Sequence, residues 1–241
     1  MSRTIVVTGG GVGIGRAVAA AFVAGGDRVF ITGRREDVLK ETAAQLGGDV
    51  EPVVCDATDV DQVEALRERL PEVVDVLVNN VGGTANLHPD LSGDLRAVVE
   101  HWKANLDSNL MGAVLTTTVV EPLLPSGGAV IHIGSFATDR GQGSYGAAKA
   151  ALASWNLHLA RRLGPRGITT NVVSPGYIAD TEFFGAHLTP EFHQARTAET
   201  LLGRAGVPED VAGVVHFLAT PGARHITAQV LHVNGGALTT R

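Results

Sequence analysis

The amino-acid sequence predicts an α/β protein with a three-layer, doubly wound fold around a seven-stranded, mostly parallel sheet. Short runs rich in β-branched residues recur along the chain, and most of them are apolar at nearly every position. Such runs are typical of parallel strands that are covered on both faces. Amphipathic stretches separate the runs, so strands and helices alternate. The expected strands are residues 4–8, 28–32, 50–55, 74–79, 129–134, 168–174 and 229–233.

The segments between these strands have the character of helices. Residues 15–26 are rich in alanine and end in two glycines, and residues 59–70 form an amphipathic stretch. Alternation of this kind implies right-handed crossovers between neighbouring parallel strands. No internal repeat, low-complexity linker or shift in composition divides the sequence. We therefore expect a single domain over residues 1–241, with ligands at the carboxyl ends of the strands.

The composition narrows the class of protein. The chain has 241 residues, 44% of them hydrophobic, and a net charge of −6 without a long basic run, which argues against a nucleic-acid partner. The single cysteine, Cys55, excludes an internal disulfide, and the nine histidines lack metal-ligand spacing, so no metal is expected. His132 alternates with isoleucines and is expected to be a core residue. Without a membrane-length apolar run or a signal-peptide pattern, the sequence favours a cytoplasmic protein with no membrane partner.

A glycine-rich turn follows the first expected strand. The segment TGGGVGIG, residues 8–15, lies between that strand and an alanine-rich helix. Glycines permit a tight turn and let the backbone approach a pyrophosphate, which then lies against the positive end of the helix dipole. The pattern predicts a dinucleotide site, and the alternative is a purely structural turn. The candidate cofactor contacts in this turn are Gly9, Gly11, Val12, Gly13, Ile14 and Gly15.

The second and third strands end in residues that bear on the choice of cofactor. Gly33, Arg34 and Arg35 stand where an acidic residue would bind the ribose hydroxyls of NAD. A guanidinium can instead hold a 2′-phosphate through charge-assisted bonds, which favours NADP(H) over NAD(H). The alternative is a pair of solvated arginines. Asp56 ends the third strand next to Ala57 and could accept a hydrogen bond from the adenine amino group, or cap the following turn.

Seven motifs in order along the chain resemble those of the compact, single-domain short-chain dehydrogenases/reductases. Residues 8–15 match the family's glycine turn, and the other six are CDATD (55–59), NNVG (79–82), DSNLMGA (107–113), IHIGS (131–135), YGAAK (145–149) and SPGYIADTEF (174–183). The pattern is most similar to the 3-oxoacyl carrier-protein reductase group. The resemblance implies a Rossmann fold and covers essentially the whole chain.

The segment YGAAK places a phenol and an ammonium one helical turn apart, so Tyr145 and Lys149 share a face. A free phenol titrates near pKa 10, and a neighbouring ammonium is expected to lower that pKa towards the working range. Alone, the pattern is more typical of an ordinary surface pair than of a catalytic one. The resemblance implies that Tyr145 is the general acid/base, that Ser135 binds the substrate oxygen and that Asn109 holds a water of a proton relay. The ten positions from Ser135 to Tyr145 form a shorter loop than is usual in the family.

The resemblance implies further contacts to the cofactor. Lys149, beside Tyr145, would bind the nicotinamide ribose, and the loop from Pro175 would hold the nicotinamide carboxamide. The common spacing places threonine where Asp180 stands, one residue before Thr181. The additional candidate contacts are Asn80, Gly82, Pro175, Gly176, Ile178 and Thr181.

Residues from about 182 to 206 correspond to the family's substrate lid. Phe183, Phe184, Leu188 and Phe192 either line an apolar pocket or pack the lid's own helices.

The expected function is transfer of a hydride between NADP(H) and a ketone or secondary alcohol, most nearly as a 3-oxoacyl or polyketide-type ketoreductase. The alternatives are a secondary-alcohol, sugar or steroid dehydrogenase working oxidatively, and a non-catalytic NADP(H)-sensing protein. The partner is a small carbonyl or alcohol substrate, free or bound to a carrier protein. Residues 100–110 resemble a dimerisation helix, so a homo-oligomer, tetramer or dimer, is expected. The arginines that would meet an acidic carrier protein, or else be solvated, are Arg140, Arg161, Arg162 and Arg166.

Overall fold

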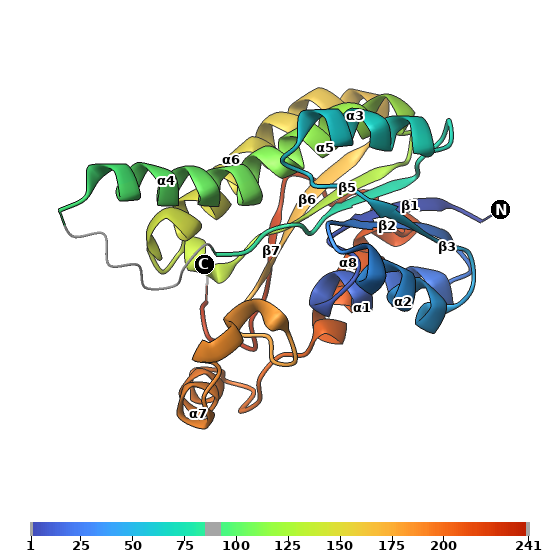
Figure 1. The fold of residues 1–241 in the computed structure, drawn as a ribbon. Coiled ribbons are helices and arrows are strands. Elements are labelled where there is room, and N and C mark those ends of the chain that lie inside the picture. The colour runs from blue at the N-terminus through green and yellow to red at the C-terminus, as the bar shows by residue number, and fades with distance from the viewer. Residues whose placement is uncertain (1, 85–92, 240–241) are drawn as a thin grey trace.

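The computed structural model describes residues 2–84 and 93–239. Its seven strands form one sheet in the order β3-β2-β1-β4-β5-β6-β7, and every pairing between neighbours is parallel (Figure 1). The predicted doubly wound fold is therefore confirmed. The strands are β1 Thr4–Thr8, β2 Arg28–Gly33, β3 Val50–Val54, β4 Val76–Asn79, β5 Ala129–Ile133, β6 Thr169–Pro175 and β7 Val230–Val233.

Helices cover both faces of the sheet. In Figure 1, α1, α2 and α8 lie on one side, and α3, α5 and α6 lie on the other. The longest helix, α6, has 21 residues. The helices of the described residues are α1 Gly13–Ala24, α2 Glu36–Leu46, α3 Val60–Arg69, α4 Leu95–Leu106, α5 Gly112–Val120, α6 Gly143–Leu163, α7 Pro190–Ala198 and α8 Pro208–Leu218. Within those residues, no helix combines the length and apolar character that crossing a membrane requires.

Two hydrophobic cores, one on each face, explain why the strands are apolar throughout. Ile5 and Val7 of β1 point into the core beneath α1 and α8, whereas Val6 between them points into the core beneath α3, α5 and α6. Alternate side chains of one strand thus enter different cores. Both sides of β1 must be apolar, and the sequence shows no alternation there.

The site of ligand binding follows from this topology. β1 is paired with β2 on one side and with β4 on the other, so the chain reverses its direction of travel across the sheet after β3. Loops that leave the carboxyl ends of β1 and β4 diverge at this switch point and open a crevice. Most strands begin within one residue of the expected position. β4 was expected to begin at residue 74 but begins at Val76, and the Val74 amide donates to the carbonyl of Leu123 outside the sheet.

Candidate active site

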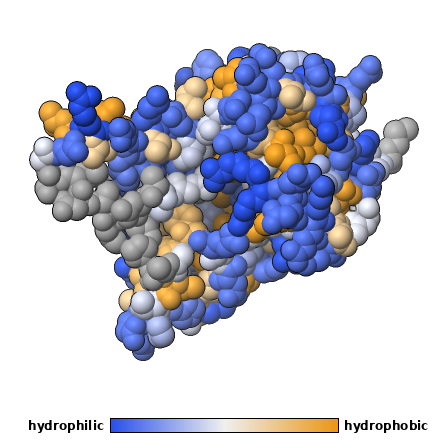
Figure 2. Space-filling model, in the orientation of Figure 1, coloured by the Kyte–Doolittle hydropathy of each residue, from blue (hydrophilic) through white to orange (hydrophobic). Residues whose placement is uncertain are grey.

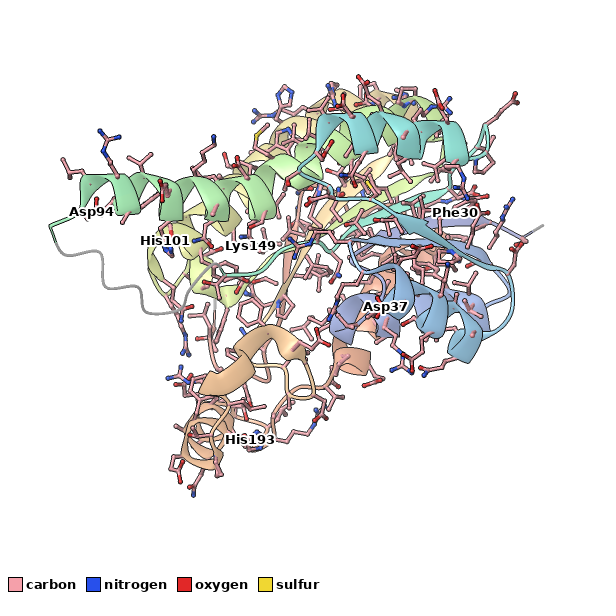
Figure 3. The ribbon with its side chains drawn as sticks, in the orientation of Figure 1. Phe30, Asp37, Asp94, His101, Lys149 and His193 are labelled. Atoms are coloured by element: carbon pink, nitrogen blue, oxygen red, sulfur yellow. The ribbon has the colours of Figure 1, made fainter. Side chains whose placement is uncertain are left out.

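A cleft of about 1430 Å³ lies along the carboxyl ends of the strands. It reaches from the turn after β2, past the glycine turn and the first residues of α6, to α7. Figure 2 shows strongly hydrophilic residues gathered near the centre of the face drawn there, between the upper helices and the lower block of the molecule. In Figure 3, Lys149 and His101 lie on the α4 and α6 side, and His193 marks the α7 segment below. Every candidate cofactor residue lines the cleft except Gly15, which packs against Gly9 and Asn80 of its wall.

The glycine turn has the geometry that a pyrophosphate requires. Gly9 and Gly13 adopt positive φ angles of 66° and 52°. A Cβ on Gly15 would lie 2.1 Å from the carbonyl oxygen of Gly9, so only glycine fits there. Val12 caps α1 without a side-chain hydrogen bond, and the first turn of the helix carries no acidic residue. The first amides of α1 therefore face the cleft with the positive end of the helix dipole and fit a bound dinucleotide phosphate.

Asn80 supports this turn from the neighbouring strand. Its side-chain amide donates to the carbonyls of Thr8 and Gly9 at 3.1 Å each, and its backbone amide donates to the Thr8 hydroxyl at 3.0 Å. Asn80 lines the cleft, but its amide group is already engaged in holding the turn. Asn80 therefore has a structural role in holding the glycine turn, in addition to the contact with the cofactor that the sequence predicts.

Arg34 and Arg35, the two arginines expected to bind a 2′-phosphate, line one end of the cleft. We call it the adenosine end, because the adenosine of a dinucleotide is expected there. Arg34 and Arg35 follow β2, and the Arg35 guanidinium pairs with Glu182 at 2.9 Å. Asp56 also lines the cleft, and its carboxylate accepts from the amide and hydroxyl of Thr58 at 3.0 and 2.8 Å. These hydrogen bonds match the alternative in which Asp56 caps the turn that follows it. The Asp56 carboxylate still lines the cleft. Ala57 beside it is buried.

Three residues of the expected catalytic set, Ser135, Tyr145 and Lys149, line the cleft, and the fourth, Asn109, is buried beside it. Ser135 follows β5 and caps a short 3₁₀ helix, with its Oγ accepting from the Ala137 amide at 3.1 Å. Tyr145 and Lys149 lie on the first two turns of α6, with the ammonium 6.0 Å from the centre of the phenol ring. Lys149 Nζ donates to the carbonyl of Ile133 at 2.9 Å, which ties α6 to the end of β5.

Asn109 reaches the same place from the opposite wall. A π-helical turn, Asp107–Met111, joins α4 to α5, and π turns are frequent at functional sites. The Asn109 side chain bonds Gly83 twice, accepting from its amide at 3.1 Å and donating to its carbonyl at 2.7 Å. A Cβ on Gly82 would lie 2.6 Å from Asn109 Oδ1 and 3.0 Å from Lys149 Nζ. Glycine at position 82 therefore lets the amide and the ammonium approach one another.

The ionisation of the pair differs from the sequence-based expectation. Burial raises the pKa of Tyr145 from 10.0 to about 12, and hydrogen bonding with Ser135 acts in the opposite direction. The expected lowering of the phenol's pKa by Lys149 is not seen in this arrangement, because loss of solvent around the phenol dominates its pKa and only the hydrogen bond with Ser135 opposes it. Burial also lowers the pKa of Lys149 from 10.5 to about 8. At neutral pH the phenol is therefore protonated, and the ammonium beside it loses its proton more readily than that of a solvated lysine.

A buried polar cluster behind Lys149 was not expected from the sequence. His132 is fully buried, as predicted, with its Nδ1 3.1 Å from the side-chain amide nitrogen of Asn79, which also donates to the Thr117 hydroxyl at 2.8 Å. Its ring packs against Trp155 at 5.3 Å. Burial, together with the charge of Lys149, lowers the pKa of His132 to about 3, so the imidazole is neutral. Among the described residues, no group of three metal-ligating side chains is present.

The loop after β6 explains the displaced threonine. Asp180 adopts a positive φ of 58°, and Thr181, which follows it, packs 3.4 Å from the position that a Cβ on Gly13 would take. Thr181 Oγ1 donates to the carbonyl of Ile178 at 3.4 Å. The left-handed residue turns the chain so that a threonine one position later faces the glycine turn. Together with Pro175 and Gly176, this loop lines the cleft beside the catalytic set.

We call residues 182–206 the lid segment. It begins with a 3₁₀ helix, Glu182–His187, and continues through α7. The Phe183 ring lies 5.6 Å from the ring of Tyr145. Phe184 and Phe192 both pack against Tyr177, at 5.3 and 5.9 Å. The sequence left open whether Phe183, Phe184 and Phe192 line a pocket or pack the lid segment. They do both, since their rings pack on one another and also line the cleft.

Two features of the lid segment differ from expectation. Leu188 is largely exposed. Tyr177 also belongs to this cluster, which the sequence did not indicate, and its hydroxyl lies 2.9 Å from His193 Nδ1.

The arginines considered for a carrier protein are engaged with acidic side chains or lie far from the cleft. Arg140 pairs with Glu199 at 2.6 Å and donates to the carbonyl of Ala237. Arg162 and Arg166 both contact Glu121. Arg161 and Arg162 lie in the last turn of α6, whereas the catalytic pair lies at its beginning. Because a helix rises about 1.5 Å per residue, this separation is roughly 25 Å.

The sheet order, the crevice at the switch point and the glycine turn define an α/β protein of the Rossmann class. The model of the family described as enoyl-(acyl carrier protein) reductase matches residues 10–238. The chain belongs to the short-chain dehydrogenase/reductase family, which confirms the resemblance seen in its motifs.

Relatives of known activity match over nearly the whole chain. The 3-oxoacyl-[acyl-carrier-protein] reductase of Salmonella typhimurium is 35% identical over 243 residues, covering 97% of this chain and 96% of that protein. The 3-oxoacyl-[acyl-carrier-protein] reductase of Synechocystis is 36% identical over 251 residues, covering 98% and 96%.

Two solved structures share the fold. A short-chain dehydrogenase/reductase from Brucella melitensis, described as glucose/ribitol dehydrogenase, has a TM-score of 0.89 at 30% identity and covers 99% of this chain and 97% of that chain. A blue fluorescent protein from a metagenomic library, in complex with NADPH, has a TM-score of 0.87 at 30% identity, with 98% of each chain covered.

Proposed function

We propose that this protein is an NADP(H)-dependent ketoreductase that reduces a ketone to a secondary alcohol. The observation that carries the proposal is that Ser135, Tyr145 and Lys149 line one cleft beside the glycine turn, with Asn109 buried close to Lys149 across Gly82. A bound NADPH would supply the hydride. The residues of this chain would bind the carbonyl, stabilise the charge that develops on its oxygen and deliver a proton to that oxygen.

The proton is donated by Tyr145. The Ser135 hydroxyl binds the carbonyl oxygen and stabilises the negative charge that develops there. The Tyr145 hydroxyl, kept protonated by its burial, gives its proton to that oxygen as general acid. Lys149 stabilises the resulting phenolate by its charge and returns a proton to it, because its lowered pKa makes that release easy. Asn109, between Gly83 and Lys149, positions the path by which Lys149 regains its proton from solvent. In the oxidative direction the same phenol acts as base.

The cofactor contacts follow the cleft. The amides of the glycine turn would bind the pyrophosphate, Arg34 and Arg35 would hold the 2′-phosphate, and the loop from Pro175 to Thr181 would hold the nicotinamide amide. Lys149 would also bind the nicotinamide ribose. The NADPH complex of a structural relative supports this choice of cofactor.

The substrate is proposed to be a 3-oxoacyl or polyketide-type ketone. The two 3-oxoacyl-[acyl-carrier-protein] reductases among the relatives support this class. Because Arg140, Arg162 and Arg166 are paired with glutamates, an apolar ketone held by the phenylalanines of the lid segment fits the cleft better than recognition of an acidic carrier. A secondary-alcohol or sugar dehydrogenase is the second candidate, favoured by the description of the Brucella structure.

The described surface also supports the proposed homo-oligomer. A groove along α4 and the π turn is almost wholly apolar, and several of its side chains are exposed, Val99 to 64% and Trp102 to 42%. An exposed apolar strip of this kind is typical of a face that pairs with another chain. We propose that two copies meet through α4, in the cytoplasm.

A kinetic panel tests the proposed function. The purified protein is given NADPH and either short 3-oxoacyl thioesters or unrelated ketones, and NADP⁺ with sugars and secondary alcohols in parallel. Consumption of NADPH with 3-oxoacyl thioesters supports the proposal, and faster turnover of alcohols with NADP⁺ favours the second candidate. Tight NADPH binding without turnover of any compound would identify a sensing protein and contradict the proposal.

A further inference from the structure

An ion pair joins the adenosine end of the cleft to the lid segment. Arg35 is the residue before α2, directly after β2, and Glu182 is the first residue of the lid segment. The Arg35 guanidinium and the Glu182 carboxylate lie 2.9 Å apart although 147 positions separate them in the sequence. Both side chains line the cleft. The pair therefore connects two walls that a bound dinucleotide would lie between.

The root of the lid segment is fixed beside this pair. Thr181, immediately before Glu182, packs against Gly13 of the glycine turn. Ile178, at the start of the same loop, forms a β-bridge with Gly206 at the far end of the lid segment. Glu182 thus stands on an anchored base, between the pyrophosphate turn and the arginines after β2. Its carboxylate cannot move far from the place where a 2′-phosphate would be bound.

We propose that Glu182 is a specificity-determining residue that competes with the cofactor's 2′-phosphate for Arg35. The inference rests on the proposed NADP(H) preference. The hydrogen bond from Arg35 Nη2 to Glu182 Oε2 uses a donor that a 2′-phosphate would otherwise receive. A phosphate next to Glu182 is also repelled by the carboxylate. Arg35 therefore leaves Glu182 when the cofactor carries a 2′-phosphate and stays with it when the cofactor lacks one.

The competition for Arg35 affects both the affinity for NADP(H) and the attachment of the lid segment. Glu182 weakens the preference for NADP(H) that Arg34 and Arg35 create. It also ties the lid segment to the turn after β2 only when the 2′-phosphate is absent. The exposed fractions of the two side chains, 53% for Arg35 and 63% for Glu182, indicate a solvated pair. Such pairs contribute little to folding stability, so variants at position 182 are expected to fold normally.

Two small ligands allow the effect of Glu182 on 2′-phosphate binding to be measured without hydride transfer. Adenosine 2′,5′-bisphosphate and adenosine 5′-monophosphate differ only in the 2′-phosphate, and neither contains the nicotinamide. Isothermal titration calorimetry measures both affinities for the wild-type protein, for Glu182→Gln and for Glu36→Gln. Glu36 is the matched control, since it lies in the first turn of α2, is also 63% exposed and pairs with Lys40 at 2.6 Å. Both variants remove one negative charge close to Arg35.

We expect Glu182→Gln to bind the bisphosphate about three- to tenfold more tightly than wild type, because the competing pair and the repulsion are both removed. Binding of the monophosphate stays unchanged, and Glu36→Gln, which removes a nearby charge but no partner of Arg35, tightens bisphosphate binding clearly less than Glu182→Gln does. Equal effects on both ligands, or the same gain in Glu36→Gln, would overturn the inference while leaving the cofactor proposal intact. If the wild-type protein does not prefer the bisphosphate at all, the NADP(H) proposal fails, and this inference fails with it.

Discussion

At the scale of single residues, burial controls the ionisation of the proposed catalytic pair, Tyr145 and Lys149. Tyr145 and Lys149 share a helix face, as their spacing requires, yet burial moves their pKa values apart, from 10.0 and 10.5 to about 12 and about 8. The shared face of Tyr145 and Lys149 could be predicted from the sequence, because it depends only on their spacing within one helix. The direction of the Tyr145 shift could not, because it depends on how segments distant in the sequence, the lid segment among them, cover the phenol.

Burial of Lys149 predicts a pH-dependent stability. Its pKa falls from 10.5 to about 8 on folding, so between these values the unfolded chain binds a proton that the folded protein does not. The free energy of unfolding should therefore rise as the pH is raised from about 8 towards 10. Lys149→Met should lose this rise and be more stable than wild type at neutral pH, because no charge is buried.

Chemical denaturation at a series of pH values measures the effect. The range should stay below pH 10, because the raised pKa of Tyr145 acts in the opposite direction above its ordinary value of 10.0. Parallel curves for wild type and Lys149→Met would contradict the prediction.

Arg34 gives a second prediction at this scale. Arg34→Ala should weaken NADPH binding by about 10- to 100-fold and NADH binding by much less, since charge-assisted bonds to a phosphate are among the strong ones. Fluorescence titration with each cofactor measures the difference. Equal losses for the two cofactors would mean that the 2′-phosphate is bound elsewhere.

At the scale of elements, the sequence predicted those parts whose shape is set locally. The strands and the glycine turn follow from apolar runs and from Gly9, Gly13 and Gly15. Gly9 and Gly13 adopt positive φ angles that favour glycine, and Gly15 has no room for a Cβ. The π turn around Asn109 and the positive φ of Asp180 could not be predicted, since both depend on packing between distant segments. For the same reason the pairing of Arg35 with Glu182 was not foreseen.

The glycine turn gives a prediction for an element. Gly15→Ala should destabilise the protein by about 2 kcal/mol or more and abolish NADPH binding, because its Cβ would lie 2.1 Å from the Gly9 carbonyl oxygen. Gly213→Ala is the control, since a Cβ at that position in α8 meets nothing within 4 Å. It should stabilise the helix by about 0.5–1 kcal/mol. Thermal unfolding with and without NADPH measures both, and a Gly15→Ala protein of wild-type stability would contradict the model of the turn.

At the scale of the whole molecule, the apolar face of α4 predicts assembly through that helix. Val99→Glu should dissociate the oligomer, because a charge would be buried at the contact. Val60→Glu is the control, since Val60 on α3 is similarly exposed at 54% and lies outside the groove. Light scattering coupled to size-exclusion chromatography gives the mass of each. A wild-type mass for Val99→Glu, or a monomeric wild type, would show that α4 is not the contact.

The central claim, that Tyr145 is the proton donor of an NADPH-dependent reduction, is tested most directly by one comparison. Wild type and Tyr145→Phe are assayed by the fall in NADPH absorbance with the ketone that wild type reduces best, and their NADPH affinities are measured by calorimetry. We predict that the variant binds NADPH within about twofold of wild type and that its kcat falls by about a hundredfold or more, as loss of a general acid requires. A variant that binds NADPH normally and retains wild-type kcat would contradict the assignment of Tyr145.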